Sequence, residues 1–143
     1  VIEGVEWKML LTKEGAFTDF EWFTGFSNLP VTEGNWTINK DPNSPTPFLY
    51  IEWNRNTTEG TADVKYTSVV SGSLQNGSYI HYGKTNEIPH NRFYQIYGAE
   101  ENRLIDIKWN FEQRFGRVKD AIYFEDTNWH CWDDRLDDID CIE

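Results

Sequence analysis

The residues best suited to chemistry gather near the end of the chain. Residues 128–141 hold two tryptophans, one histidine, five aspartates and both cysteines. Hard cations such as Ca²⁺ take several carboxylate and carbonyl oxygens as ligands, so an acidic loop of this kind indicates a calcium site. A helical turn would place its aspartates in pairs four positions apart. The predicted metal ligands are Asp133, Asp134, Asp137 and Asp138. No other cofactor is predicted.

A solvated acidic tail is the alternative for the same segment. In that arrangement the carboxylates point into water, and the apolar side chains between them pack against an open core. The spacing does not match an EF-hand loop, which needs a D-x-D-x-D-G run and a glutamate at its twelfth position. The apolar side chains concerned are Trp129, Trp132, Leu136 and Ile139.

The seven tryptophans of the chain favour carbohydrate binding. A flat indole stacks on the apolar face of a sugar ring, and nearby amide or carboxylate groups bind the hydroxyls. Residues 128–132 look like a loop, where such side chains would be exposed. The predicted ligand-binding residues are Asn128, Trp129, His130 and Trp132.

Trp53 and Trp109 have two interpretations. Each is followed by an asparagine, which suits a sugar site, but each also alternates with an isoleucine two positions before it. That alternation puts Ile51 and Trp53 on one side of a strand, and Ile107 and Trp109 likewise, as expected for core residues.

The chain shows no motif typical of catalysis. His81, His90 and His130 are scattered, and the H-E-x-x-H, C-x-x-C and G-x-S-x-G patterns are missing. Two carboxylates suffice for glycoside hydrolysis, and Glu21 and Glu52 would be the first acids to consider. We predict no catalytic residue and favour a binding function over an enzyme.

Composition and charge limit the partners. The 143 residues fit one domain, at roughly 100–200 residues per domain, and we expect it to span residues 1–143. A net charge of −11 repels phosphate backbones and anionic lipid. No apolar stretch is long enough to cross a membrane. We therefore expect neither a nucleic-acid partner nor membrane insertion, while the oligomeric state stays open.

Two features favour a secreted or cell-surface protein. Cys131 and Cys141 are spaced to close one disulfide around the last loop, which would stabilise the fold by about 2–3 kcal/mol. Two free thiols in a cytosolic protein are the alternative. Asn-x-Ser/Thr triplets at Asn35, Asn56 and Asn76 are compatible with a secreted surface.

Alternation of apolar and polar residues predicts strands almost everywhere. Short connections rich in Gly and Asn, such as Asn76-Gly77, join these runs as hairpins, and residues 41–47, with three prolines, read as an irregular bridge. The expected strands are 48–53, 62–70, 78–83, 92–98, 104–109 and 117–124, with further ones at 5–10, 17–23 and 35–39.

These runs predict an all-β fold, a single-domain antiparallel β-sandwich built from a meander of hairpins. Gly34-Asn35-Trp36, followed by meander strands, resembles the G-x-W opening of lipocalin-type barrels. That resemblance implies the alternative, an up-and-down barrel around a small apolar ligand.

The sequence thus leads to a secreted, non-catalytic domain that binds carbohydrate or another extracellular ligand through exposed aromatic and polar side chains. The lipocalin-like barrel with its apolar ligand is one alternative. An assembly or interaction protein without a small ligand is the other, because surface aromatics also form protein contacts.

Overall fold

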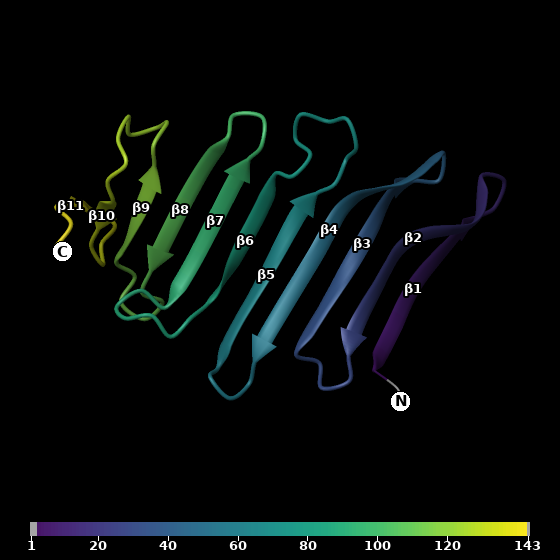
Figure 1. Cartoon of the computed structure of the whole chain (residues 1–143), viewed down its shortest axis with the longest axis horizontal. Coiled ribbons are helices and arrows are strands. Elements are labelled where there is room, and N and C mark those ends of the chain that lie inside the picture. The colour runs from purple at the N-terminus through teal and green to yellow at the C-terminus, as the bar shows by residue number, and fades with distance from the viewer. Residues whose placement is uncertain (1–2, 143) are drawn as a thin grey trace.

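A computed structural model describes residues 3–142 as one antiparallel sheet whose strands lie side by side in sequence order. The two ends of the chain lie at opposite edges of this sheet (Figure 1). The first two residues and the last residue of the predicted domain lie outside the described residues. The strands are β1 (Gly4–Lys13), β2 (Phe17–Asn28), β3 (Glu33–Asp41), β4 (Ser44–Asn56), β5 (Thr61–Ser68), β6 (Tyr79–Lys84), β7 (Arg92–Gly98), β8 (Arg103–Trp109), β9 (Gly116–Asp120), β10 (His130–Trp132) and β11 (Asp138–Ile139).

The predicted all-β class and the antiparallel meander are confirmed, and the six main predicted runs correspond to β4 through β9. Residues 3–142 contain no helix long and apolar enough to span a membrane. They form a single open layer in which β1 and β11 are not paired with each other. This layer does not decide between the sandwich and the lipocalin-like barrel.

The irregular bridge predicted for residues 41–47 is wrong, because β4 already starts at Ser44. The pairing of β3 with β4 changes register around Asn39, which lies opposite Pro47. A proline has no N–H to donate to the ladder, so it is tolerated in a strand where the pairing is irregular. The prolines therefore lie in an irregular stretch of a long strand, and they do not interrupt that strand.

A bulge also explains the unclear pattern of residues 17–23, which do form a strand. Glu21 pairs with Leu10 and Phe23 with Met9, so Trp22 is the extra residue between them. An extra residue shifts the alternation by one position and moves later side chains to the other face. Aromatic residues at 20, 22 and 23 thus fit neither a simple strand nor a helix.

The two faces of the sheet differ sharply in polarity. The apolar face carries two rows of register partners: Trp53, Val64, Tyr82, Tyr94, Ile107 and Val118 in one, and Ile51, Tyr66, Ile80, Ile96 and Ile105 in the next. The polar face carries the row Glu52, Lys65, His81, Gln95, Asp106 and Lys119. These rows confirm the expected alternation of apolar and polar residues from β4 to β9.

No second layer covers the apolar face within the described residues. Besides Gly116, only Phe20, Ser27 and Asp120 are buried among them. The accessible surface is 10151 Å², about 2,500 Å² more than the roughly 7,700 Å² of a compact 16.9 kDa monomer. Stability must therefore come from contacts within the plane of the sheet.

One contact within the plane of the sheet occurs three times: a tryptophan ring packs on a glycine of the neighbouring strand. An indole on the apolar face lies over a glycine directly opposite it on the next strand, and a Cβ on that glycine would overlap the ring. Absence of a side chain lets the ring approach the backbone closely, which fixes its orientation and covers the hydrogen bonds beneath it. The pairs are Gly25 with Trp36, Gly34 with Trp53, and Gly116 with Trp132.

Replacing one of these glycines should therefore destabilise the sheet. We expect Gly25→Ala to lower the free energy of unfolding by about 1–3 kcal/mol, because the new methyl group displaces the Trp36 ring. Gly98→Ala is the matched control, since nothing lies within 4 Å of a Cβ there, and it should be neutral or stabilising. Urea unfolding measures both variants, and equal losses would contradict the close-approach argument.

Candidate functional site

An open cavity of about 1210 Å³ lies at the C-terminal end of the sheet. The β6–β7 connection, the β8–β9 connection and the C-terminal segment form its walls. Of the predicted ligand-binding residues, Asn128, Trp129 and Trp132 line this cavity, whereas His130 does not. His130 lies next to these residues, because all four line a smaller adjoining hollow of about 390 Å³.

Trp132 is held in place from two sides. Its ring lies over Gly116 on the neighbouring strand, and its Nε1 donates a hydrogen bond of 2.8 Å to the backbone oxygen of Arg114. A ring fixed by both a packing contact and a hydrogen bond loses little further entropy when a ligand stacks on it. Trp132 is therefore a preorganised part of the cavity wall.

Trp129 lies against two cations of β9. The guanidinium carbon of Arg117 lies 4.4 Å from the centre of the indole and Nζ of Lys119 lies 4.8 Å from it. Such cation–π contacts hold the ring and place positive charge beside the cavity. The cavity wall as a whole carries both signs of charge, because Glu112, Asp133, Asp134 and Asp140 line it together with Arg114 and Arg117.

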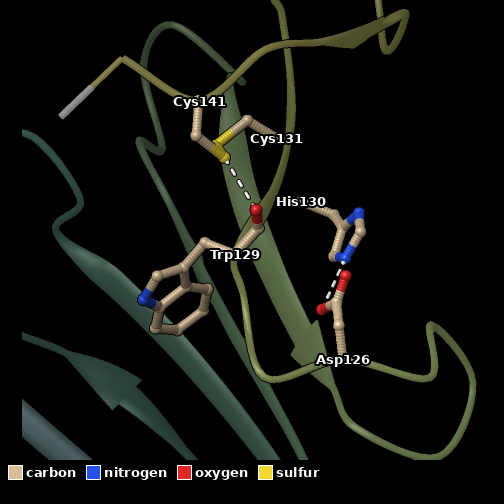
Figure 2. Close-up of a disulfide and its surroundings, with 5 residues drawn as sticks. All are labelled: Asp126, Trp129, His130, Cys131 and Cys141. Atoms are coloured by element: carbon tan, nitrogen blue, oxygen red, sulfur yellow. Dashed lines mark hydrogen bonds and ion pairs between the residues drawn. A yellow bond between two sulfur atoms is a disulfide. The ribbon is translucent and has the colours of Figure 1, made fainter.

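The predicted disulfide between Cys131 and Cys141 is present (Figure 2). It ties the end of the chain back to β10, so that residues 139–142 become part of the cavity wall. The Sγ of Cys141 lies 3.1 Å from the carbonyl oxygen of Trp129. A disulfide sulfur carries no proton, so this is a close contact and not a hydrogen bond.

The side chain of His130 does not line this cavity and instead contacts Phe124 and Asp126. Its ring stacks on Phe124 with centroids 3.7 Å apart. Its Nε2 lies 3.1 Å from Oδ1 of Asp126 (Figure 2). The pKa of Asp126 lies below its ordinary value. The main cause is the hydrogen bond from the backbone amide of Asn128, and the second is the hydrogen bond with the His130 ring. These bonds fix the chain just before β10 and so position Trp129.

The acidic segment is a hairpin turn between β10 and β11. The carboxylate of Asp133 accepts hydrogen bonds from the backbone amides of Arg135 and Asp137, at 2.9 and 3.0 Å. The helical pairing of aspartates therefore does not occur, and Asp138 instead pairs with Trp132 as part of β11. Within residues 3–142 no three His, Cys, Asp or Glu side chains are grouped as a metal site would need. Calcium binding by Asp133, Asp134, Asp137 and Asp138 stays a prediction.

The apolar side chains of the tail do not pack as a plug. Leu136 is 71% exposed and Ile139 is 46% exposed, whereas Trp129 and Trp132 are half-buried. The two tryptophans therefore pack against β9 and the loop before it, while the tip of the turn lies in water.

Sequence reasoning missed the other wall of the cavity. Glu112, Arg114 and Phe115 come from the β8–β9 connection, and His90 comes from the β6–β7 connection. The sequence marks these segments as loops, but nothing in it indicates that they meet the C-terminal segment. Their meeting follows from the register of β8, β9 and β10, which single-sequence patterns do not reveal.

The two acids suggested for catalysis lie away from this cavity. Oε2 of Glu21 forms an ion pair of 2.8 Å with Nζ of Lys8, and Glu52 is exposed on the polar face. They lie on different strands, β2 and β4, in ordinary surface surroundings.

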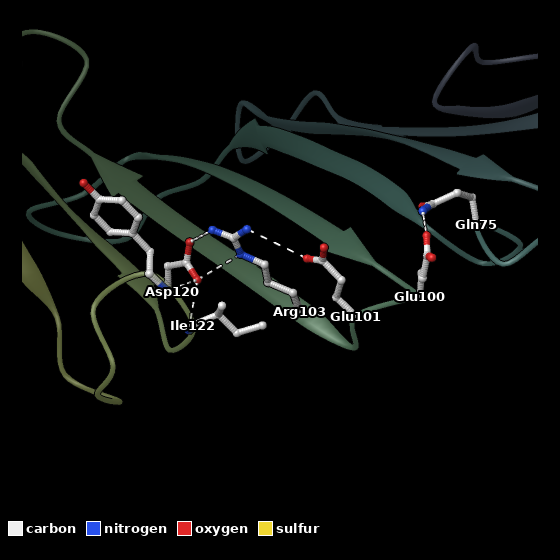
Figure 3. Close-up of polar contacts among 7 residues, drawn as sticks. Gln75, Glu100, Glu101, Arg103, Asp120 and Ile122 are labelled. Atoms are coloured by element: carbon white, nitrogen blue, oxygen red, sulfur yellow. Dashed lines mark hydrogen bonds and ion pairs between the residues drawn. The ribbon is translucent and has the colours of Figure 1, made fainter.

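A buried ion pair anchors the start of the β9–β10 connection. Arg103 of β8 binds the carboxylate of Asp120 through Nε at 3.1 Å and also through Nη2 (Figure 3). The same carboxylate accepts the amides of Ile122 and Tyr123, each at 3.2 Å, which ends the strand predicted for 117–124 at Asp120. The hydrogen bonds from Arg103 lower the pKa of Asp120, and burial of the carboxylate raises it by less. The pKa of Asp120 therefore lies below its ordinary value.

The comparisons with known proteins add no relative: no protein-family model, no curated protein and no solved structure matches this chain. The functional argument therefore stands on the geometry alone. That geometry offers two half-buried indoles, an amide and several charged groups around one open cavity.

Removing the partner of Asp120 should lower stability at neutral pH and make stability depend less on pH in the acid range. A depressed folded-state pKa adds stability above about pH 3.8, and that stability is lost as the pH falls through the folded pKa. We expect Arg103→Gln to cost about 2 kcal/mol of unfolding free energy at neutral pH and to raise the Asp120 pKa. Unfolding at several pH values and a carboxyl NMR titration measure both, and an unchanged Asp120 pKa would contradict the assignment.

His90, in the cavity wall, should stay neutral to lower pH than a free histidine. Burial first, and then the charges of Arg117 and Lys108, lower its pKa from the ordinary 6.5. The unfolded chain therefore binds the proton more tightly, and this group destabilises the fold as the pH falls below about 6.5. Arg117→Gln should raise the His90 pKa part of the way, as read by NMR titration. Lys65→Gln, on a distant strand, should leave it unchanged.

Proposed function

We propose that this protein is a non-catalytic binding domain that recognises carbohydrate in the cavity at its C-terminal end. The observation that carries the proposal is that Asn128, Trp129 and Trp132 line one open cavity of about 1210 Å³. A sugar ring has an apolar face that stacks on an indole and hydroxyls that need polar partners.

The wall supplies both kinds of group. Trp132 offers a ring that is fixed over Gly116, and Trp129 offers one that is fixed by cations. Asn128, Glu112 and other polar side chains surround the rings and have amide or carboxylate groups for hydroxyls. A volume of this size accepts an oligosaccharide more readily than one small apolar molecule.

Secretion or display on the cell surface belongs to the same proposal. The disulfide between Cys131 and Cys141 is compatible with an extracytoplasmic location, because such bonds persist in oxidising compartments. We also propose that the acidic turn between β10 and β11 binds Ca²⁺, an ion for which carboxylate oxygens are suitable ligands. The binding experiment therefore includes Ca²⁺.

The decisive experiment is a thermal-shift and tryptophan-fluorescence screen against a panel of oligosaccharides and polysaccharides, with Ca²⁺ or with EDTA. Ligand bound only to the folded state raises the melting temperature. We expect one class of glycan to give a saturable response. Trp132→Ala should weaken binding at least about tenfold, because it removes the stacking ring.

Trp36→Ala is the matched control, since Trp36 also lies over a glycine but belongs to β3, near the other end of the sheet. It should lose stability in a similar way and keep glycan affinity. Equal losses of affinity in both variants would point to a general effect on folding. No response to any glycan would overturn the proposal.

The uncovered apolar face favours one second candidate, an interaction or assembly protein. An excess of about 2,500 Å² of accessible surface is within the range that large permanent interfaces bury. Light scattering on the same samples decides between the candidates if no glycan binds, because an assembly would have a mass above that of one chain.

A further inference from the structure

A second cavity, of about 540 Å³, lies over the apolar face between β4 and β8. Trp53, Val64, Tyr82 and Trp109 form its apolar lining, and none of its lining residues belongs to the cavity at the C-terminal end. Trp53 and Trp109, which sequence analysis left between core and ligand site, line opposite ends of this hollow, on β4 and β8. Both are half-buried and both face this hollow.

Three cations line the same cavity. Arg55, Lys84 and Arg92 belong to one register row, in which Arg55 pairs with Ala62, Ala62 with Lys84, and Lys84 with Arg92. Within residues 3–142 none of the three forms an ion pair. Unpaired positive charge thus gathers beside an aromatic surface in a chain whose net charge is −11.

Lys84 and Arg92 stand directly opposite each other on neighbouring strands. Like charges in this position destabilise a sheet. Arg92 donates a hydrogen bond of 2.9 Å to the backbone oxygen of Asn91, and its guanidinium carbon lies 4.7 Å from the centre of the Phe111 ring. A broken local rule of this kind is typical of a functional site.

The nearest acids do not remove this charge. Asp63 lines the cavity, but its carboxylate is bound to His81 at 2.9 Å. Glu112 lies close enough for Arg92 and Lys84 to help lower its pKa, after its stronger hydrogen bond to Asn91. Neither acid forms an ion pair with Lys84 or Arg92.

We propose that this second cavity binds a small amphipathic anion, a molecule with one carboxylate, sulfonate or phosphate group on an aromatic or aliphatic body. The anionic group lies between Lys84 and Arg92 and relieves their repulsion. The apolar body lies against Tyr82 and Trp109, which is directly opposite Arg92. A long polyanion is disfavoured, because its ends would extend over a strongly acidic protein.

The test uses anilinonaphthalene sulfonate, an aromatic anion that becomes fluorescent in apolar surroundings. Its control probe is N-phenylnaphthylamine, which has the same ring system without the sulfonate. We expect the sulfonate to bind the native protein more tightly than the neutral probe, and to bind more weakly as salt is added. Lys84→Gln combined with Arg92→Gln should weaken the sulfonate about tenfold and leave the neutral probe unchanged.

Lys65→Gln is the matched control variant, because Lys65 lies on β5 but on the polar face. It should keep full affinity for the sulfonate. Equal affinity of the double variant and the native protein would overturn the proposal, and so would equal binding of the two probes. Competition by a fatty acid or by a phosphate ester then distinguishes the natural sources of the anion.

A second measurement separates a ligand site from a merely structural cluster. In the free protein Lys84→Gln should raise the melting temperature by about 1–2 °C, because it removes a repulsive pair. The sulfonate should raise the melting temperature of the native protein more than that of the variant. A lower melting temperature for Lys84→Gln would show that the lysine stabilises the sheet, which contradicts the proposal.

Discussion

Hydrogen bonding between neighbouring backbones holds this protein together, and within residues 3–142 side-chain contacts in the plane of the sheet and one disulfide support it. A layer without a cover cannot bury large side chains, so aromatic rings lie along the sheet and shield the ladder beneath them. Trp36 over Gly25 and Trp53 over Gly34 show the arrangement most clearly. Both functional proposals use rings that this constraint has already fixed.

Local patterns in the sequence predicted much of the fold. Alternation around Ile51 and Ile107 identified strands, and the short polar loops identified hairpins, because both depend on neighbouring residues. Bulges were missed for the same reason: Trp22 and Pro47 lie in strands whose irregular register is decided by the partner strand. The openness of the layer was not foreseen either, since alternation shows which face is apolar but not what covers it.

The candidate sites were predictable to different degrees. Trp129 and Trp132 were found because they stand in a dense loop next to Cys131. Arg114 was missed, because its backbone reaches Trp132 only through the pairing of β9 with β10. The sequence also did not reveal that Lys84 and Arg92 lie opposite each other. That position depends on the register of the hairpin formed by β6 and β7.

The succession of strands in chain order has a consequence for how the sheet comes apart. Each strand contacts almost only the strands next to it, so the sheet behaves as a one-dimensional array that can fray from either end while its middle stays intact. The cavity at the C-terminal end is built on the last and shortest strands, β10 and β11, where fraying begins. A ligand bound there would hold these terminal strands in the sheet, and its affinity would include the free energy needed to keep them paired. The disulfide to Cys141 lowers this free energy by holding the terminal segment beside β10 in advance.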